Sequence, residues 1–239
     1  MSVEKVFDGG GANGVNVFVV SSGGFHMNAV VRGGTISLVS CCPPSDSVFS
    51  ALETLGRVKH VFLLSTAANA SAQIEWSAAF VKKFSALLWA PTAVSGVDML
   101  LSKETLLPFP GKVFLFSSVR NEAVLLVSQH RLVLSGSASL PLSGSDEKFE
   151  RWSRQSEGSL AKDYESMLTT LRPDVFLQER SLLTRSSVIE NIIAANNRGT
   201  LSSIRSPPRS KLRFMWFLLF LLNIGLLLVY IVSRGYKHQ

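Results

Sequence analysis

Residues 40–64 read SCCPPSDSVFSALETLGRVKHVFLL, and the fold prediction starts from this run. It opens on a Ser-Cys-Cys-Pro-Pro segment, in which the paired prolines end a strand. Asp46 or Ser47 is placed to cap the helix that follows, and Gly56 is placed to end it. The mostly apolar run HVFLL at 60–64 is typical of a strand buried on both faces. This strand–helix–strand order predicts an α/β fold with helices packed on sheets.

Further β-rich runs lie on both sides of this segment. Several are apolar throughout, which indicates strands covered on both faces. Glycine pairs at 23–24 and 33–34 predict hairpin turns between the early runs. The expected strands are 15–20, 27–32, 35–40, 86–91, 112–117, 123–128, 131–136 and 173–178.

Helical patterns lie between and after these runs. Residues 72–84 carry apolar side chains at helical spacing around Trp76, and residues 159–171 form a second amphipathic stretch. Ser187 with Glu190 forms a capping box, which predicts a last helix ending near Gly199. Residues 1–199 are long enough for one domain with a sizeable core.

Four stretches of this domain share their order with a known family. They are the run at 40–64, the helix around Trp76, the hairpin EAVLLVSQHRLVLSG at 122–136 and the segment LTTLRPDVFLQERS at 168–181. Their order resembles that of the metallo-β-lactamase superfamily over roughly residues 13–197. The resemblance implies a four-layer αββα sandwich for residues 1–199.

The same resemblance implies a two-metal site at the ends of the strands, built from several histidines and carboxylates. At the matching positions, residues 65–72 contain neither histidine nor aspartate, and Ser117-Ser118 replaces an expected histidine. Gly136 stands where a bridging aspartate belongs, and 179–181 read Glu-Arg-Ser in place of His-Gly. We therefore predict no metal-ligating, catalytic or cofactor-binding residues, and a pseudoenzyme without a cofactor.

Other catalytic signatures are also missing from the sequence, which contains no GxSxG, P-loop, GxGxxG, HExxH or CxxC pattern. His130, with serines nearby, is an alternative catalytic base, but a hairpin residue is the simpler interpretation. His60 is expected to be structural, and His26 is expected to face solvent in a glycine-rich turn. The adjacent Cys41 and Cys42 are expected to be buried apolar residues and not a disulfide.

Residues 214–232 read FMWFLLFLLNIGLLLVYIV, and fourteen of these nineteen residues are Leu, Ile, Val or Phe. A helix of this length is about 28 Å long, close to the thickness of the hydrocarbon core. The fourteen residues favour insertion by about 4 to 8 kcal/mol. Since only the tail 233–239 follows, we predict a tail anchor inserted after synthesis. The side chains expected to contact the membrane include Phe214, Trp216, Asn223, Gly225 and Tyr230.

The formal net charge of +7 belongs to the region around this span. Without the six Lys and Arg residues that flank it, 18 basic residues face 17 acidic ones, so we predict no nucleic-acid partner. More positive charge before the span than after it places residues 1–199 in the cytosol. The apolar span favours the endoplasmic reticulum, with the mitochondrial outer membrane as the alternative. The basic residues before the span are Arg205, Arg209, Lys211 and Arg213, and those after it are Arg234 and Lys237.

Residues 200–213, TLSSIRSPPRSKLR, are expected to be a solvated basic linker. Ser206, which precedes a proline, is a candidate phosphorylation site whose added charge would offset the basic residues at the membrane. The amide of Asn223 is placed to hydrogen-bond another transmembrane helix, although a single tolerated polar residue is a comparable explanation.

The sequence therefore predicts a non-enzymatic, single-pass, tail-anchored membrane protein. Its degenerate metallo-hydrolase-like domain is expected to be a binding or scaffold module whose partners are the lipid bilayer and a protein. Two alternatives remain at this point. One is a hydrolase of non-metal mechanism that uses the same crevice, with His130 or Asp98 taking part. The other is an accessory subunit of a membrane complex.

Overall fold

The computed structural model describes residues 1–11, 13–66, 70–117, 121–135, 159–178 and 181–184. All of them belong to one compact unit, Met1–Asn196. In the part of the chain so described, no helix is long and apolar enough to cross a bilayer. The predicted helix at 187–199, the linker, the span and its tail lie outside the described residues. The same holds for Arg205, Ser206, Arg209, Lys211, Arg213, Phe214, Trp216, Asn223, Gly225 and Tyr230.

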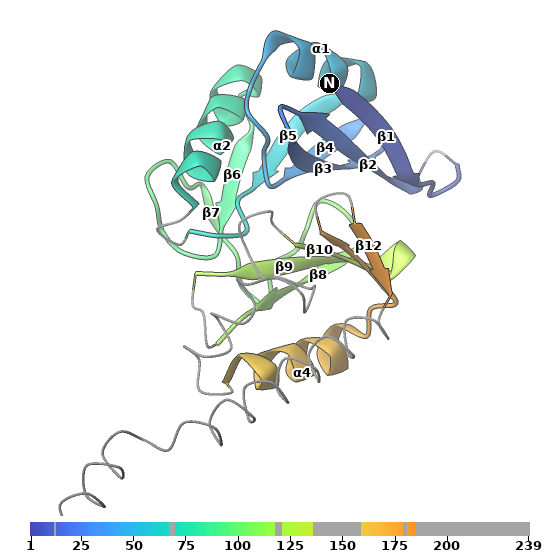
Figure 1. Ribbon diagram of the computed structural model, residues 1–239, viewed down its shortest axis with the longest axis vertical. Helices are drawn as coiled ribbons and strands as arrows, with labels where there is room; N and C mark the ends of the chain where they lie inside the picture. Colours follow the sequence, from blue (N-terminus) through green and yellow to red (C-terminus); the bar gives the residue numbers. More distant parts are fainter. Residues whose placement is uncertain (12, 67–69, 118–120, 136–158, 179–180, 185–239) are drawn as a thin grey trace, which may run out of the picture. The chain divides into compact units, whose positions relative to one another are not determined.

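The first sheet has seven strands in the order β1-β2-β3-β4-β5-β6-β7 (Figure 1). Strands β1 to β4 alternate in direction, whereas β4 to β7 run parallel to one another. Most of the buried apolar residues of this sheet lie on β2 to β6. The strands are β1 (Ser2–Phe7), β2 (Val15–Ser22), β3 (Phe25–Arg32), β4 (Thr35–Val39), β5 (Arg57–Phe62), β6 (Leu87–Ala90) and β7 (Met99–Leu100).

The second sheet has five strands in the order β12-β11-β10-β9-β8. Only β10 and β11 are parallel neighbours, and a 3₁₀ turn at Ser128–His130 joins β9 to β10. The strands are β8 (Gly111–Leu115), β9 (Ala123–Val127), β10 (Leu132–Ser135), β11 (Val175–Gln178) and β12 (Ser181–Thr184).

The two sheets pack face to face with helices outside them (Figure 1). Phe62 and Trp89 of the first sheet share one buried cluster with Leu125 and Leu134 of the second. A separate cluster lies between the first sheet and two helices, α1 (Asp46–Leu55) and α2 (Ser71–Phe84). Helix α4 (Ser159–Leu171) lies against β8. The layers therefore follow the helix–sheet–sheet–helix order expected from the sequence.

The start of α1 differs from the prediction by one or two residues. Ser45, and neither Asp46 nor Ser47, is the N-cap, because its Oγ accepts a hydrogen bond from the Val48 backbone N at 3.4 Å. Ser45 has the extended backbone that a cap requires, whereas Asp46 is already the first helical residue. The predicted end at Gly56 is confirmed. A Cβ at Gly56 would lie only 2.4 Å from the Gly34 carbonyl oxygen, so the β4–β5 crossover needs glycine there.

Three strands were not predicted, and each lacks the apolar pattern of a buried strand. Strand β1 is an edge strand whose first four residues are exposed. Strand β7 has only two residues, both exposed. Strand β12 pairs only with β11 and is the edge of the second sheet. Edge strands of this kind carry little hydrophobic signal, since only one of their sides is paired.

Candidate functional site

The carboxyl ends of several strands meet at one end of the sandwich. Strands β8 and β10 run in the same direction because both are antiparallel to β9, and β11 is parallel to β10. The segment after β5 joins them, since the Ala123 N donates to the Leu64 O at 2.9 Å and the Thr66 N donates to the Asn121 O at 3.0 Å. The described residues at or beside the implied ligand positions therefore lie at a single end of the domain; they are Ser65, Ser117, Ser135 and Gln178.

A buried carboxyl group occupies this end. Glu122, immediately before β9, is 0% exposed, and Ser65 donates its hydroxyl hydrogen to the Glu122 Oε1 at 2.5 Å. Burial raises the pKa of Glu122 to about 8, and the hydrogen bond from Ser65 lowers it by a smaller amount. Within the described residues the Oε2 atom has no hydrogen-bond partner. Glu122 is therefore mainly a neutral acid at pH 7 in the folded chain.

Two more side-chain pairs use the hydroxyl groups that stand near the implied ligand positions. The Ser117 Oγ donates to the Asp163 Oδ1 at 2.5 Å and links the end of β8 to α4. The Thr66 Oγ1 lies 2.5 Å from the Thr92 Oγ1, so the loops after β5 and β6 are also joined. At this end of the sandwich, side-chain hydrogen bonds therefore link separate strands, loops and helix α4 to one another.

His60 and His26 lie on strands of the first sheet. His60 on β5 accepts a hydrogen bond at its Nδ1 from the Trp89 Nε1 at 3.3 Å. Burial, together with the nearby charge of Lys59, lowers the pKa of His60. This confirms the structural role predicted for it. His26 is half-buried on β3, so the expectation that it faces solvent is wrong in part.

His130 and Asp98, the two residues of the alternative catalytic hypothesis, both hydrogen-bond to backbone groups. The His130 Nε2 lies 2.6 Å from the Val15 O at the start of β2. Because His130 follows the last residue of β9 and Glu122 precedes the first, the two lie at opposite ends of that strand. The Asp98 Oδ2 accepts the backbone N–H of Leu88 at 2.7 Å. The structure does not bring His130 and Asp98 together with Glu122 in one site.

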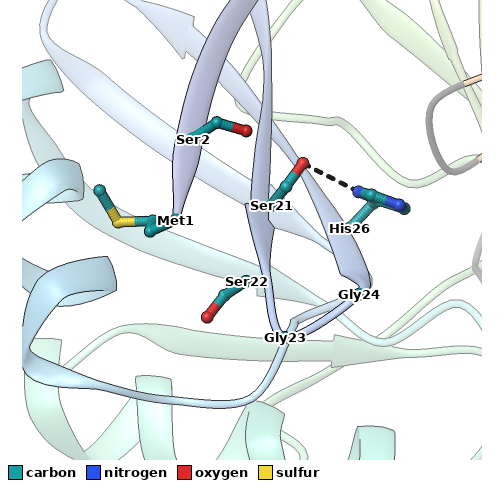
Figure 2. A pocket seen from close by; sticks show the side chains of 7 residues that line it. All are labelled: Met1, Ser2, Ser21, Ser22, Gly23, Gly24 and His26. Carbon is teal, nitrogen blue, oxygen red and sulfur yellow. Dashed lines mark hydrogen bonds between the residues drawn. The ribbon is translucent and has the colours of Figure 1, made fainter.

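A shallow pocket of about 350 Å³ lies at the tip of the β2–β3 hairpin (Figure 2). In it, a hydrogen bond joins the Ser21 Oγ to the His26 Nδ1 at 2.8 Å. Figure 2 shows that Ser21 and His26 point to one side of the hairpin, whereas Ser22 points away from them. The polar groups therefore do not converge on one point. The pocket is lined by Met1, Ser2, Ser21, Ser22, Gly23, Gly24 and His26.

Among the described residues, the side chains at this end of the sandwich do not form a two-metal centre. Across the described ranges, no three His, Cys, Asp or Glu side chains group closely enough to hold a metal ion. The two carboxyl groups, Glu122 and Asp163, each accept a hydrogen bond from a serine. Cys41 and Cys42 are free and buried, as predicted, and burial raises the pKa of both thiols, that of Cys42 to about 11.

Replacing Ser65 tests whether its hydrogen bond to Glu122 stabilises the domain. The Ser65→Ala variant is expected to lose about 1 to 3 kcal/mol of unfolding free energy, because it leaves the buried Glu122 Oε1 without its donor. Urea unfolding of the two chains measures the difference. The matched control is Ser50→Ala on the exposed side of α1, which is expected to change stability by less than about 0.5 kcal/mol. Equal losses of unfolding free energy in the two variants would contradict a stabilising role for the Ser65–Glu122 hydrogen bond.

Comparison with known proteins adds evidence on the fold. No protein-family model and no curated protein sequence matches the chain. Among solved structures, the DIM-1 metallo-β-lactamase has a TM-score of 0.59 at 13% identity, covering 82% of this chain and 97% of that one. The apo chemotaxis sensor ODP from T. denticola has a TM-score of 0.55 at 14% identity, covering 80% and 92%. The VMB-1 structure has a TM-score of 0.56 at 11% identity, covering 82% and 97%. The described domain therefore has a metallo-β-lactamase-like fold.

Proposed function

We propose that this chain is a non-enzymatic, tail-anchored membrane protein whose degenerate metallo-hydrolase-like domain serves as a binding or scaffold module at the cytosolic face. The observation that carries this proposal is the set of hydroxyl–carboxyl pairs at the end of the sandwich. Ser65 and Ser117 lie at positions where the resemblance implies metal ligands. Each donates a hydrogen bond to a buried carboxyl group, Ser65 to Glu122 and Ser117 to Asp163.

This arrangement supports a stabilising role in place of a catalytic one. A metal-bound hydroxide requires imidazole or carboxylate ligands with free lone pairs directed at one point. Here burial raises the pKa of Glu122 to about 8, and its Oε1 already accepts a hydrogen bond from Ser65. The serine hydroxyls at the same end are poor nucleophiles without a base, and the described histidines each take part in hydrogen bonds with other groups.

The membrane part of the proposal rests on the sequence of residues 200–239. The apolar span at 214–232, the basic linker before it and the short tail after it together favour a single-pass anchor with the domain in the cytosol. A domain held at a membrane by a linker is well placed to recruit a partner, since the tether raises the local concentration of both.

A turnover assay tests whether the domain is a metallo-hydrolase. The full-length chain in mild detergent, with added Zn²⁺ or Fe²⁺, is expected to hydrolyse β-lactam, phosphodiester and thioester substrates no faster than its Glu122→Gln variant. The reason is that the described carboxyl groups at this end, Glu122 and Asp163, each accept a hydrogen bond from a serine. Chelator-sensitive hydrolysis that the variant lacks would contradict the proposal.

A further inference from the structure

Strand β1 forms one edge of the first sheet (Figure 1). Among the described strands it pairs only with β2, and its residues from Ser2 to Lys5 are exposed. A strand at an edge carries backbone N–H and C=O groups with which another strand can pair. With six residues and no proline, β1 is long enough for a second strand to add to it.

The exposed apolar side chains at this edge lie on one face of the sheet. Val3 is opposite Val20 of β2, which is opposite Met27 of β3, and residues directly opposite each other share a face. Val20 and Met27 are buried in the cluster beneath the helices, so Val3 lies on the helix-covered face. Met1 lies two residues before Val3, and Figure 2 shows it on the opposite side from Ser2. Because Val3 is 38% exposed and Met1 is 60% exposed, apolar surface extends from the core to the edge.

Lys5 is the third side chain on this face of β1. Its Nζ lies 5.8 Å from the centroid of the Phe18 ring and 3.1 Å from the Asp8 Oδ2. The charge of Lys5 is therefore matched within the chain, and its aliphatic stem can cover an apolar neighbour. The pairing of β1 with β2 shifts register between Lys5 and Phe7, so the regular part of the strand ends at Lys5. The edge that another strand can extend consists of residues 2–5, with Met1 beside them.

This short edge is complementary to itself in one register. When two identical strands pair antiparallel about a two-fold axis perpendicular to the sheet, one residue lies opposite its own copy. Glu4 or Lys5 at that position would bring two like charges face to face, which is unfavourable. Ser2 at that position would leave only residues 1–3 paired. Val3 at that position places Ser2 opposite Glu4 of the second copy and Met1 opposite Lys5 of the second copy, so no like charges are opposed.

We propose that two copies of this chain associate through their β1 strands, paired antiparallel with Val3 opposite Val3 of the second copy. The two first sheets then form one continuous sheet across the two-fold axis. On the helix-covered face, Val3 packs against its own copy, and Met1 packs against the stem of Lys5 of the second copy. This inference goes beyond the proposed function and does not depend on the tail anchor, although anchoring both copies in one membrane would raise their local concentration.

A like charge at the two-fold axis tests this pairing in the full chain. Val3→Lys places two ammonium groups face to face in the dimer, at a position that is exposed in the single chain. Light scattering of the chains in mild detergent, over a range of concentrations up to high micromolar, measures the dissociation constant of the dimer. We expect a dimer for the wild type and an at least about tenfold higher dissociation constant for Val3→Lys. The matched control is Leu87→Lys, a position that is 45% exposed on β6, which is expected to dimerise like the wild type. A wild type that stays monomeric, or a Val3→Lys dimer as strong as that of the wild type, overturns the inference.

Mixing two variants tests the register of the pairing. Val3→Glu alone is expected to dimerise as weakly as Val3→Lys, because two carboxylates then face each other. An equimolar mixture of the two variants is expected to form mixed dimers, because an ammonium group then lies opposite a carboxylate. Native mass spectrometry counts the mixed dimers when one variant is produced with heavy nitrogen. A mixture that dimerises no more strongly than either variant alone overturns the register with Val3 at the two-fold axis.

The failure of this inference is distinguishable from a failure of the proposed function. A chain that stays monomeric in these experiments but remains in washed membranes and binds no metal overturns the β1 pairing alone. A chain that dimerises through β1 but is washed from membranes overturns the anchor and supports the pairing.

Discussion

Raising the pH from 5 to 8 is expected to lower the free energy of unfolding by about 4 kcal/mol through Glu122 alone. The pKa of this group is about 8 in the folded chain, against an ordinary value of 4.5. Between these values the folded chain holds a proton that the unfolded chain releases, so each unit of pH rise favours unfolding by about 1.4 kcal/mol. Below pH 4.5 both states are protonated, and above pH 8 both are ionised, so the dependence flattens at each end.

The Glu122→Gln variant isolates this effect, because its amide keeps an oxygen for the Ser65 hydroxyl but does not titrate. Its stability, measured by urea unfolding from pH 5 to 8, is expected to lack the downward slope. The pKa of His60 is lowered in the folded chain, so its own contribution rises with pH up to about 6.5 and opposes that of Glu122. Subtracting the unfolding free energy of the variant from that of the wild type cancels the contribution of His60. Parallel slopes for the two chains would show that Glu122 is not held neutral by burial.

Placing two arginines in the predicted span is expected to release the chain from membranes almost completely. Leu222→Arg with Ile224→Arg replaces two apolar residues near the middle of 214–232. Each arginine costs about 2.5 to 3.5 kcal/mol at a helix centre, so the pair offsets most of the roughly 4 to 8 kcal/mol that favours insertion. Alkaline washing of membranes, followed by detection of the chain in pellet and supernatant, measures the change.

The control for this experiment is Leu222→Ile with Ile224→Leu, which keeps the span apolar and is expected to remain in the pellet. If the arginine variant also stays in the washed pellet, residues 214–232 are not what holds the chain at the membrane. The anchor would then need another explanation.

The sequence predicted the main strands and the helices of the described domain, because their apolar periodicity reflects burial directly. The runs at 15–20, 35–40 and 123–128 correspond to β2, β4 and β9. It missed β1 and β7, whose exposed residues carry no such pattern. The end of α1 was predicted because Gly56 has a clear signature. Its start was misplaced because Ser45, Asp46 and Ser47 are all good capping residues, and only the backbone conformation distinguishes them.

The sequence predicted the positions of the serines in the candidate site, but not the carboxyl groups that they contact. The resemblance located Ser65 and Ser117 at the implied ligand positions, but not what they bond to. Glu122 reads as the first residue of an apolar hairpin, and Asp163 reads as one polar residue of an amphipathic helix. Their partners lie 57 and 46 residues away in the chain, and contacts over such distances leave no local pattern. The burial that raises the pKa of Glu122 is likewise a property of the packed layers.

The metal content of the purified full-length chain tests the central claim most directly. The claim is that a metallo-hydrolase-like fold is here held together by hydroxyl–carboxyl pairs at the end where the family holds its metals. Elemental mass spectrometry of chain produced in cells supplied with zinc and iron is expected to find far less than one equivalent of either metal, and a strong chelator is expected to leave the thermal unfolding temperature unchanged. Stoichiometric zinc or iron that survives purification, with a lower unfolding temperature after chelation, would contradict the account.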